Sequence, residues 1–161
     1  MKKMISGFIL ATLLTAGIIL YVEYRLPKVY YVDIRKVYDE FELKKELEGK
    51  LQSFISTSNT LLDSLELQAG RTDPGSPAFG SLQQLYAARN EQFSAQGEQL
   101  TAQYDEQVWA QLNQYMQQYA SEKRCDFLLG GNGDGSIMYA HPKKDITNEM
   151  ITYVNGKYNG R

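Results

Sequence analysis

The residues that most suggest chemistry are the glycines and polar residues of FLLGGNGDGSIMYA, residues 127–140. Glycine-rich loops can cradle a phosphate, hold calcium or simply reverse the chain. A phosphate loop of the Walker type needs Lys-Ser or Lys-Thr and then a helix, and a dinucleotide loop also opens a helix. A strand-like run follows here instead. For an EF-hand starting at Asn132, position twelve would be Lys143, where calcium requires a bidentate glutamate.

The same stretch has the composition of a tight turn. Asn-Gly and Asp-Gly are the dipeptides that permit positive φ in hairpin turns. Apolar runs at 127–129 and 137–139 flank residues 130–136. The sequence therefore predicts a β-hairpin with its turn at 130–136.

The remaining inventory for catalysis or metal binding is small. The chain has one histidine, His141, which precedes a proline and is interpreted as a surface turn residue. It has one cysteine, Cys125, so neither an intramolecular disulfide nor a cysteine-rich metal site can form. The net charge of −2 gives no overall basic field for nucleic acid. We therefore expect no enzyme activity, no metal, no cofactor and no nucleic-acid partner.

The N-terminus carries an uncharged run of 19 residues, 4–22, preceded by Lys2 and Lys3. As a helix it would span about 28 Å, close to the hydrocarbon thickness of a bilayer. A signal peptide cut after Gly17 would fit the lysine pair and the small residues near the cut. Because apolar residues continue past that point, the run favours an uncleaved signal-anchor, with a cleaved signal peptide as the alternative.

Two long helices are expected after a short strand at 29–32. Asp33 can cap a helix that starts near Ile34. Apolar residues then recur every 3.7 residues or so, a helical period, across 37–69 and again across 81–122. Prolines and glycines in residues 70–80 separate the two. The pattern predicts an antiparallel helical hairpin followed, after residue 145, by a short helix with Thr147 as its N-cap and an Ile146–Ile151 staple.

The surface of this hairpin is expected to be mostly polar, and its second helix carries eleven glutamines. Four apolar residues lie one place off the predicted seams. Burial against the partner helix and contact with a client are both open for each of them. These candidate contact residues are Ile55, Leu62, Trp109 and Met116.

Two segments resemble the Skp/OmpH family of periplasmic chaperones. They are VYYVDIRKVYDEFELKKELEGKLQ near the start and CDFLLGGNGDGSIMYAHPKKDITNEMITYVN near the end. The matching motifs are Val-Asp at 32–33, Gly-Asn-Gly at 131–133, Tyr-Ala-His-Pro at 139–142 and Asp-Ile-Thr at 145–147. The resemblance covers nearly everything after residue 27.

The resemblance implies an α+β fold: a small strand body, which becomes a trimeric β-barrel-like core, and a long helical hairpin projecting from it. Residues 1–27 would form the transmembrane segment, 28–36 with 123–161 the body, and 37–122 the arm. Three short strands per chain cannot close a sheet alone, which also favours a homotrimer. The implied function is ATP-independent holding of unfolded outer-membrane β-barrel proteins. Soluble members of the family lose a signal peptide, whereas the uncharged run 4–22 favours an anchor here. The expected location is therefore the periplasmic face of the inner membrane, or the soluble periplasm if the signal is cleaved.

The charge of the arm departs from the often basic members of the family. Residues 37–122 contain five lysines and arginines against thirteen aspartates and glutamates, a net charge of −8. Attraction to acidic lipid or lipopolysaccharide is therefore not expected from charge. The alternative function is structural: a membrane-tethered coiled-coil adaptor or spacer that binds one folded envelope partner.

Overall fold

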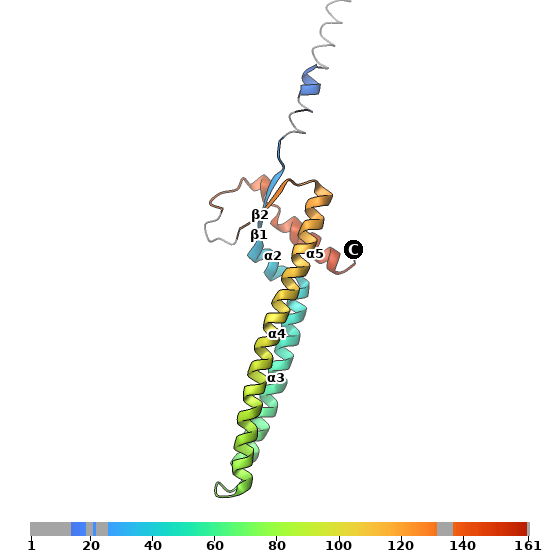
Figure 1. The fold of residues 1–161 in the computed structure, drawn as a ribbon. Coiled ribbons are helices and arrows are strands. Elements are labelled where there is room, and N and C mark those ends of the chain that lie inside the picture. Colours follow the sequence, from blue (N-terminus) through green and yellow to red (C-terminus); the bar gives the residue numbers. More distant parts are fainter. Residues whose placement is uncertain (1–13, 19–20, 22–25, 132–136, 161) are drawn as a thin grey trace, which may run out of the picture.

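A long helical arm projects from a small body of strands and short helices (Figure 1). The computed structural model describes residues 14–18, 21, 26–131 and 137–160. Helices α3 and α4 form the arm, and the other elements gather at its base. In chain order the elements are β1 (Val29–Asp33), α2 (Ile34–Glu40), α3 (Glu42–Gly70), α4 (Pro77–Lys123), β2 (Phe127–Gly131), η1 (Pro142–Lys144) and α5 (Thr147–Tyr158).

The predicted helical hairpin is confirmed, with a shorter loop than expected. At 29 and 47 residues, α3 and α4 are about 44 and 70 Å long. Helix α4 begins at Pro77, four residues before the predicted start. Proline suits the first position of a helix because its missing N–H would lack a partner there. Ser76 caps this end, its hydroxyl accepting from the Phe79 N–H at 3.2 Å.

The first predicted helix is interrupted at Phe41, which the sequence pattern did not indicate. Phe41 is extended (φ −73°, ψ 125°) between α2 and α3. Asn155 of α5 bridges the break: its amide nitrogen donates to the Glu40 carbonyl at 3.0 Å, and its oxygen accepts from the Glu42 N–H at 2.9 Å. The break lets the Phe41 side chain point into the core, where it is fully buried.

The strands pair differently from the prediction. β2 lies parallel to β1, with Val29 opposite Phe127 and Asp33 opposite Gly131. The predicted hairpin partner is wrong, because residues 137–139 form no strand in the described part of the chain. The predicted turn falls mainly on residues 132–136, outside the described residues. On its other side β1 contacts the segment that leads into α5. There the Tyr31 carbonyl accepts from the Ile146 N–H at 2.9 Å.

The close packing of the Tyr31 ring explains why residue 131 is a glycine. A Cβ at Gly131 would lie 2.6 Å from Cε2 of Tyr31, the residue two places before its partner Asp33 on β1. Real Cβ atoms do not approach so closely, so any larger residue would displace that ring.

Residue Thr147 does not cap α5 as predicted; the capping position is Ile146. The Thr147 hydroxyl instead accepts from the Asp33 N–H at 2.9 Å and donates to Asp145. It therefore ties the end of β1 to the start of α5. The predicted cap at Asp33 is confirmed, since its carboxylate accepts from the Lys36 N–H at 3.1 Å.

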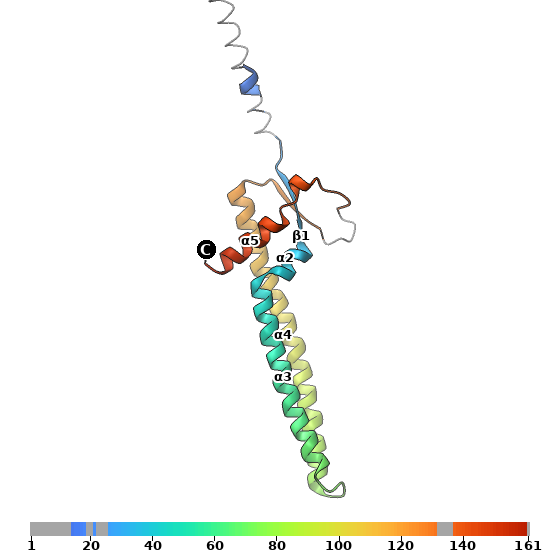
Figure 2. The ribbon, with the colours of Figure 1, turned by 180° about the vertical axis from the view of Figure 1, so that it is seen from behind.

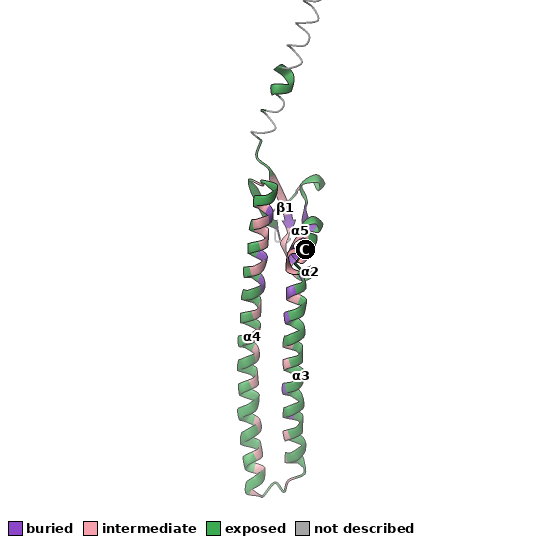
Figure 3. Cartoon of the chain, turned by 90° about the vertical axis from the view of Figure 1, so that its right-hand side faces the viewer, coloured by how far each residue is buried: buried purple, intermediate pink, exposed green. Residues whose placement is uncertain are grey.

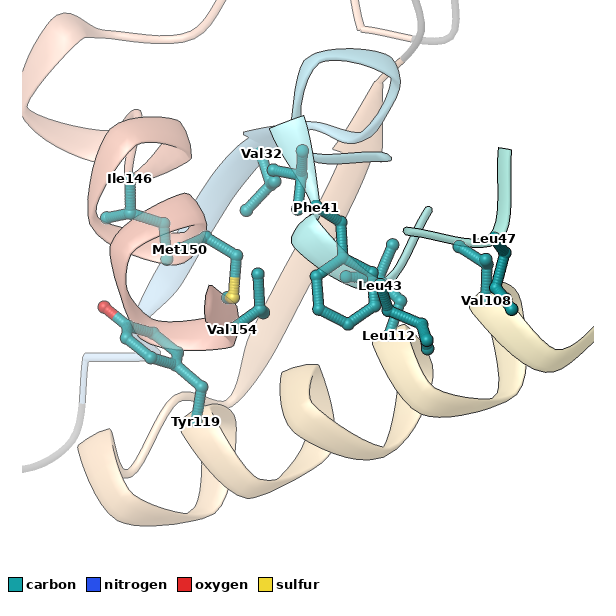
Figure 4. Close-up of a cluster of buried hydrophobic side chains, with 11 residues drawn as sticks. Val32, Phe41, Leu43, Leu47, Val108, Leu112, Tyr119, Ile146, Met150 and Val154 are labelled. Carbon is teal, nitrogen blue, oxygen red and sulfur yellow. The ribbon is translucent and has the colours of Figure 1, made fainter. Parts of the chain in front are cut away.

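The hydrophobic core lies where α5 crosses the base of the arm (Figures 2 and 4). Phe41 packs edge-to-face on Tyr115 and Tyr158, with centroids 6.2 and 5.8 Å away. The arm beyond this cluster is largely exposed (Figure 3). The buried cluster comprises Val32, Val37, Phe41, Leu43, Leu47, Val108, Leu112, Tyr119, Ile146, Met150 and Val154.

The predicted membrane anchor receives no structural support. Within the described residues, no helix combines the length and apolarity needed to cross a membrane. Most of the predicted span, residues 4–22, lies outside the described residues.

Candidate binding surfaces on the arm and its base

The seam between α3 and α4 is only partly filled by large apolar side chains. Leu43 and Leu47 are buried in this seam, and further along Leu62 is buried whereas its neighbour Leu61 is 50% exposed. Steps of three or four residues from Ser58 lead equally well to either leucine, so the helical period alone cannot distinguish them.

An open groove of about 630 Å³ runs along this seam, lined by parts of residues 51–62 of α3 and 90–105 of α4. We call it the arm groove. Phe54 and Phe93 meet in it edge-to-face, with centroids 6.2 Å apart. Ser94, whose side chain is small, and Gly97, which has none, also line it. They leave space that larger residues would fill. The arm groove therefore offers apolar surface to solvent part-way along the hairpin.

The charged groups in the arm groove are of one sign. Glu98 and Asp105 line it, both exposed, and no lysine, arginine or histidine is among the described residues that do so. The Asp105 carboxylate accepts from the Tyr38 hydroxyl at 2.7 Å. Burial, followed by this hydrogen bond, raises the pKa of Tyr38 to about 12, so the hydroxyl remains a donor at neutral pH.

A second opening of about 360 Å³ lies where α4 passes the strands. We call it the shoulder hollow. Trp109 and Met116 of α4 line it together with Ile34 and Leu128 from the body. The Trp109 ring stacks on Tyr38 at 4.8 Å and 23° and is 39% exposed. One face of the indole is therefore held while the side chain stays accessible.

The four predicted contact residues fall into two pairs. Ile55 and Leu62 line the arm groove, and Trp109 and Met116 line the shoulder hollow. Ile55 is 39% exposed, whereas Leu62 is 9% exposed and offers little area. The sequence did not indicate the two surfaces themselves, because each combines residues of elements that are distant in the chain.

Helix α5 is fastened to the base of the arm by ion pairs. Lys123 meets Glu149 at 2.9 Å, and Lys157 meets Glu122 at 3.1 Å. The hydrogen bond from Lys123, and then one from Tyr119, holds the pKa of Glu149 below its ordinary value. These contacts fix the end of α4, and with it the shoulder hollow, against the body.

His141 and Cys125, the two residues considered above for catalysis or metal binding, have no arrangement around them that suggests such a role in the described structure. The His141 ring accepts from the Lys143 N–H at 3.1 Å and so caps η1, which agrees with its prediction as a surface turn residue. Burial raises the pKa of the Cys125 thiol, which disfavours the nucleophilic thiolate form. Among the described residues, no group of three or more histidine, cysteine or acidic side chains is placed to hold a metal.

The fold is therefore a helical hairpin that projects from a small strand-containing body, with the two candidate surfaces along its length and at its base. The family model for outer membrane protein (OmpH-like) matches residues 78–154, which run from the start of α4 into α5. This match confirms the predicted resemblance to the Skp/OmpH family over residues 78–154.

A crystal structure of a candidate outer membrane chaperone (OmpH-like) from Caulobacter crescentus CB15 has a similar fold, with a TM-score of 0.51. The match covers 82% of this chain and 86% of that chain at 18% sequence identity. At this identity the similarity concerns the fold alone. A comparison with curated proteins finds no match.

Proposed function

We propose that the protein is an ATP-independent holdase for unfolded outer-membrane β-barrel proteins in the cell envelope. The observation that carries the proposal is an OmpH-like domain whose arm leaves apolar surface open in the arm groove and the shoulder hollow. The protein would act by binding, with no catalytic step.

The apolar surface of this protein is divided among separate places along the arm, and an unfolded barrel protein likewise presents its apolar side chains in separate patches. An unfolded barrel strand alternates apolar and polar side chains, so it presents many weak apolar patches. Ile55 and Trp109 are separated along the arm and each is partly exposed. Linked weak contacts of this kind add through effective concentration, and each releases without nucleotide hydrolysis. Met116 would contribute at the shoulder hollow, and Leu62, being buried, would contribute least.

Assembly as a homotrimer through the body is part of this proposal. Within the described residues the sheet has two strands, and β2 has a neighbour on one side only. Phe127 and Leu129 on β2 are 59% and 44% exposed. Unpaired strand edges and exposed apolar side chains favour coverage by other copies of the chain.

The proposed location is the periplasm, by analogy with the family. Attachment to the inner membrane through residues 4–22 is the finer form of this proposal. Mass analysis of the mature protein distinguishes the two forms: residues 1–17 present in a membrane fraction support the anchor. A mature N-terminus at Ile18 in a soluble fraction supports signal cleavage instead.

Aggregation assays with several unfolded outer-membrane proteins test the function. The purified protein, without ATP, should suppress their light scattering on dilution from denaturant. A tryptophan-free client should also change the emission of Trp109, the only tryptophan in the chain. If scattering of all clients is unchanged and one folded envelope protein binds stoichiometrically, the adaptor function replaces the holdase.

A further inference from the structure

The arm groove has the dimensions of a site for a short extended peptide. The lined part of α3 spans about 16 Å and that of α4 about 22 Å, at 1.5 Å per residue. An extended chain rises about 3.3 Å per residue, so five to seven residues or so would lie along the groove. Its volume of about 630 Å³ is within the range of ordinary ligand sites.

Nothing in the local packing requires Gly97 to be a glycine. Its φ is not positive, and a Cβ there would lie 3.8 Å from Cε1 of Phe54, an ordinary contact. Glycine lowers helix stability relative to alanine or leucine. A residue that weakens α4 and leaves its space unfilled keeps the apolar surface of the groove accessible.

The charge around the groove restricts the peptides that fit it. Residues 51–62 and 90–105 contain three acidic residues and no lysine or arginine. Beyond the ends of the groove, Lys50 is paired with Glu46 at 2.7 Å, and Arg89 donates to Gln92 at 2.8 Å. The groove is therefore apolar within and negative at its margins.

We propose that the arm groove binds an extended segment in which apolar side chains alternate with lysine or arginine. Alternation places apolar side chains on one face, towards Phe54 and Phe93, and basic ones on the other, within reach of Glu98 and Asp105. The inference rests on the proposed holdase function and adds to it a preference among client segments, for cationic over neutral or acidic ones.

Binding of labelled seven-residue peptides to the full-length protein, followed by fluorescence anisotropy, tests this preference. Three peptides alternate leucine with lysine, serine or glutamate. The lysine peptide should bind about tenfold more tightly than the serine peptide, the effect of two exposed ion pairs, and the glutamate peptide should bind most weakly. The difference between the lysine and serine peptides should shrink as salt is added.

Two variants locate the site. Gly97→Leu should fill the groove and weaken binding of both the lysine and the serine peptide, and it suits a helix, so far-ultraviolet circular dichroism should be unchanged. Glu98→Gln should reduce only the preference for lysine. The matched control is Glu106→Gln, an exposed glutamate on the same helix that does not line the groove.

The outcomes separate this inference from the function on which it rests. Equal binding of the lysine and serine peptides, or unchanged binding by Gly97→Leu, overturns the inference. If the same protein still suppresses client aggregation, the holdase function stands without it. If the lysine preference is present and Gly97→Leu weakens peptide binding while clients aggregate freely, the peptide site stands and the holdase function is wrong.

Discussion

Asn155 joins two parts of the chain that are more than 110 residues apart in sequence. Its side-chain amide serves both backbone groups exposed by the break at Phe41, the Glu40 carbonyl and the Glu42 N–H. A hydrogen bond of this kind contributes about 0.5–1.5 kcal/mol net to stability. The direction in which α3 leaves the body therefore depends on a residue of α5.

Replacing Asn155 with alanine should lower the free energy of unfolding by about 1–3 kcal/mol, the net effect of losing two hydrogen bonds to the backbone. Chemical denaturation followed by circular dichroism measures it. Asn159→Ala is the control, because the exposed side-chain amide of Asn159 donates to a carboxylate, that of Glu42, at 2.6 Å. Equal effects of the two substitutions would show that the bridge at Phe41 contributes nothing special.

At the scale of elements, the sequence predicted the two arm helices and their pairing, but not the break in the first helix or the pairing of the strands. Spacing of apolar residues located the hairpin because both helices expose a regular face to each other. It could not locate the break at Phe41, since that residue leaves the helix to meet Tyr115 and Tyr158 from elsewhere in the chain. The β-hairpin prediction failed for a related reason: turn chemistry is local, but β2 pairs with a strand about 100 residues earlier.

The candidate binding surfaces were likewise only partly predictable from the sequence. Ile55 and Trp109 could be selected from sequence because each lies beside a predicted seam. The arm groove could not, because it depends on which small residues of α4 face Phe54 of α3. That register is set by packing across the hairpin.

The attachment of α5 should weaken in acid. The Lys123–Glu149 pair lowers the pKa of the Glu149 carboxyl below its ordinary value of 4.5. A lowered folded-state pKa contributes stability above the ordinary value, and this is lost as the pH falls through the folded-state pKa. The melting temperature should therefore be steady from pH 7 to about pH 5 and fall below about pH 4.5.

The variant Glu149→Gln isolates that contribution. It should melt about 1–3 °C below the native protein at pH 7, since the pair is half exposed, and the gap should close in acid. Glu106→Gln, which makes no ion pair in the described structure, should melt like the native protein at both pH values. A gap that persists at pH 3 would mean that Glu149 acts through packing and not through its charge.

For the whole molecule, the end of the core defines how far the arm can be shortened. The core cluster extends out to Leu47 and Val108, and beyond them the hairpin is largely exposed, with Ser58 and Leu62 buried in its seam. Stability should thus reside in the body and the root of the arm. Client binding should depend on the outer part.

Removing residues 52–100 and joining the ends with a short Gly/Ser linker should therefore leave the proposed trimer intact. Light scattering checks the mass, and client aggregation should no longer be suppressed. The deletion spares Leu47 and Val108, so the core contacts remain. A monomeric shortened protein would show that the arms, and not the strands, hold the assembly together.

Parallel pairing of β1 with β2 makes everything between them a single crossover connection, since parallel strands cannot be joined by a tight turn. Lengthening or shortening both helices by equal numbers of turns moves the tip without altering either strand. Doubling a connecting segment costs only about 0.6 kcal/mol in closure entropy. The length of the arm can therefore change during evolution without any change in the body. Relatives with longer crossovers should enclose larger clients around an unchanged base.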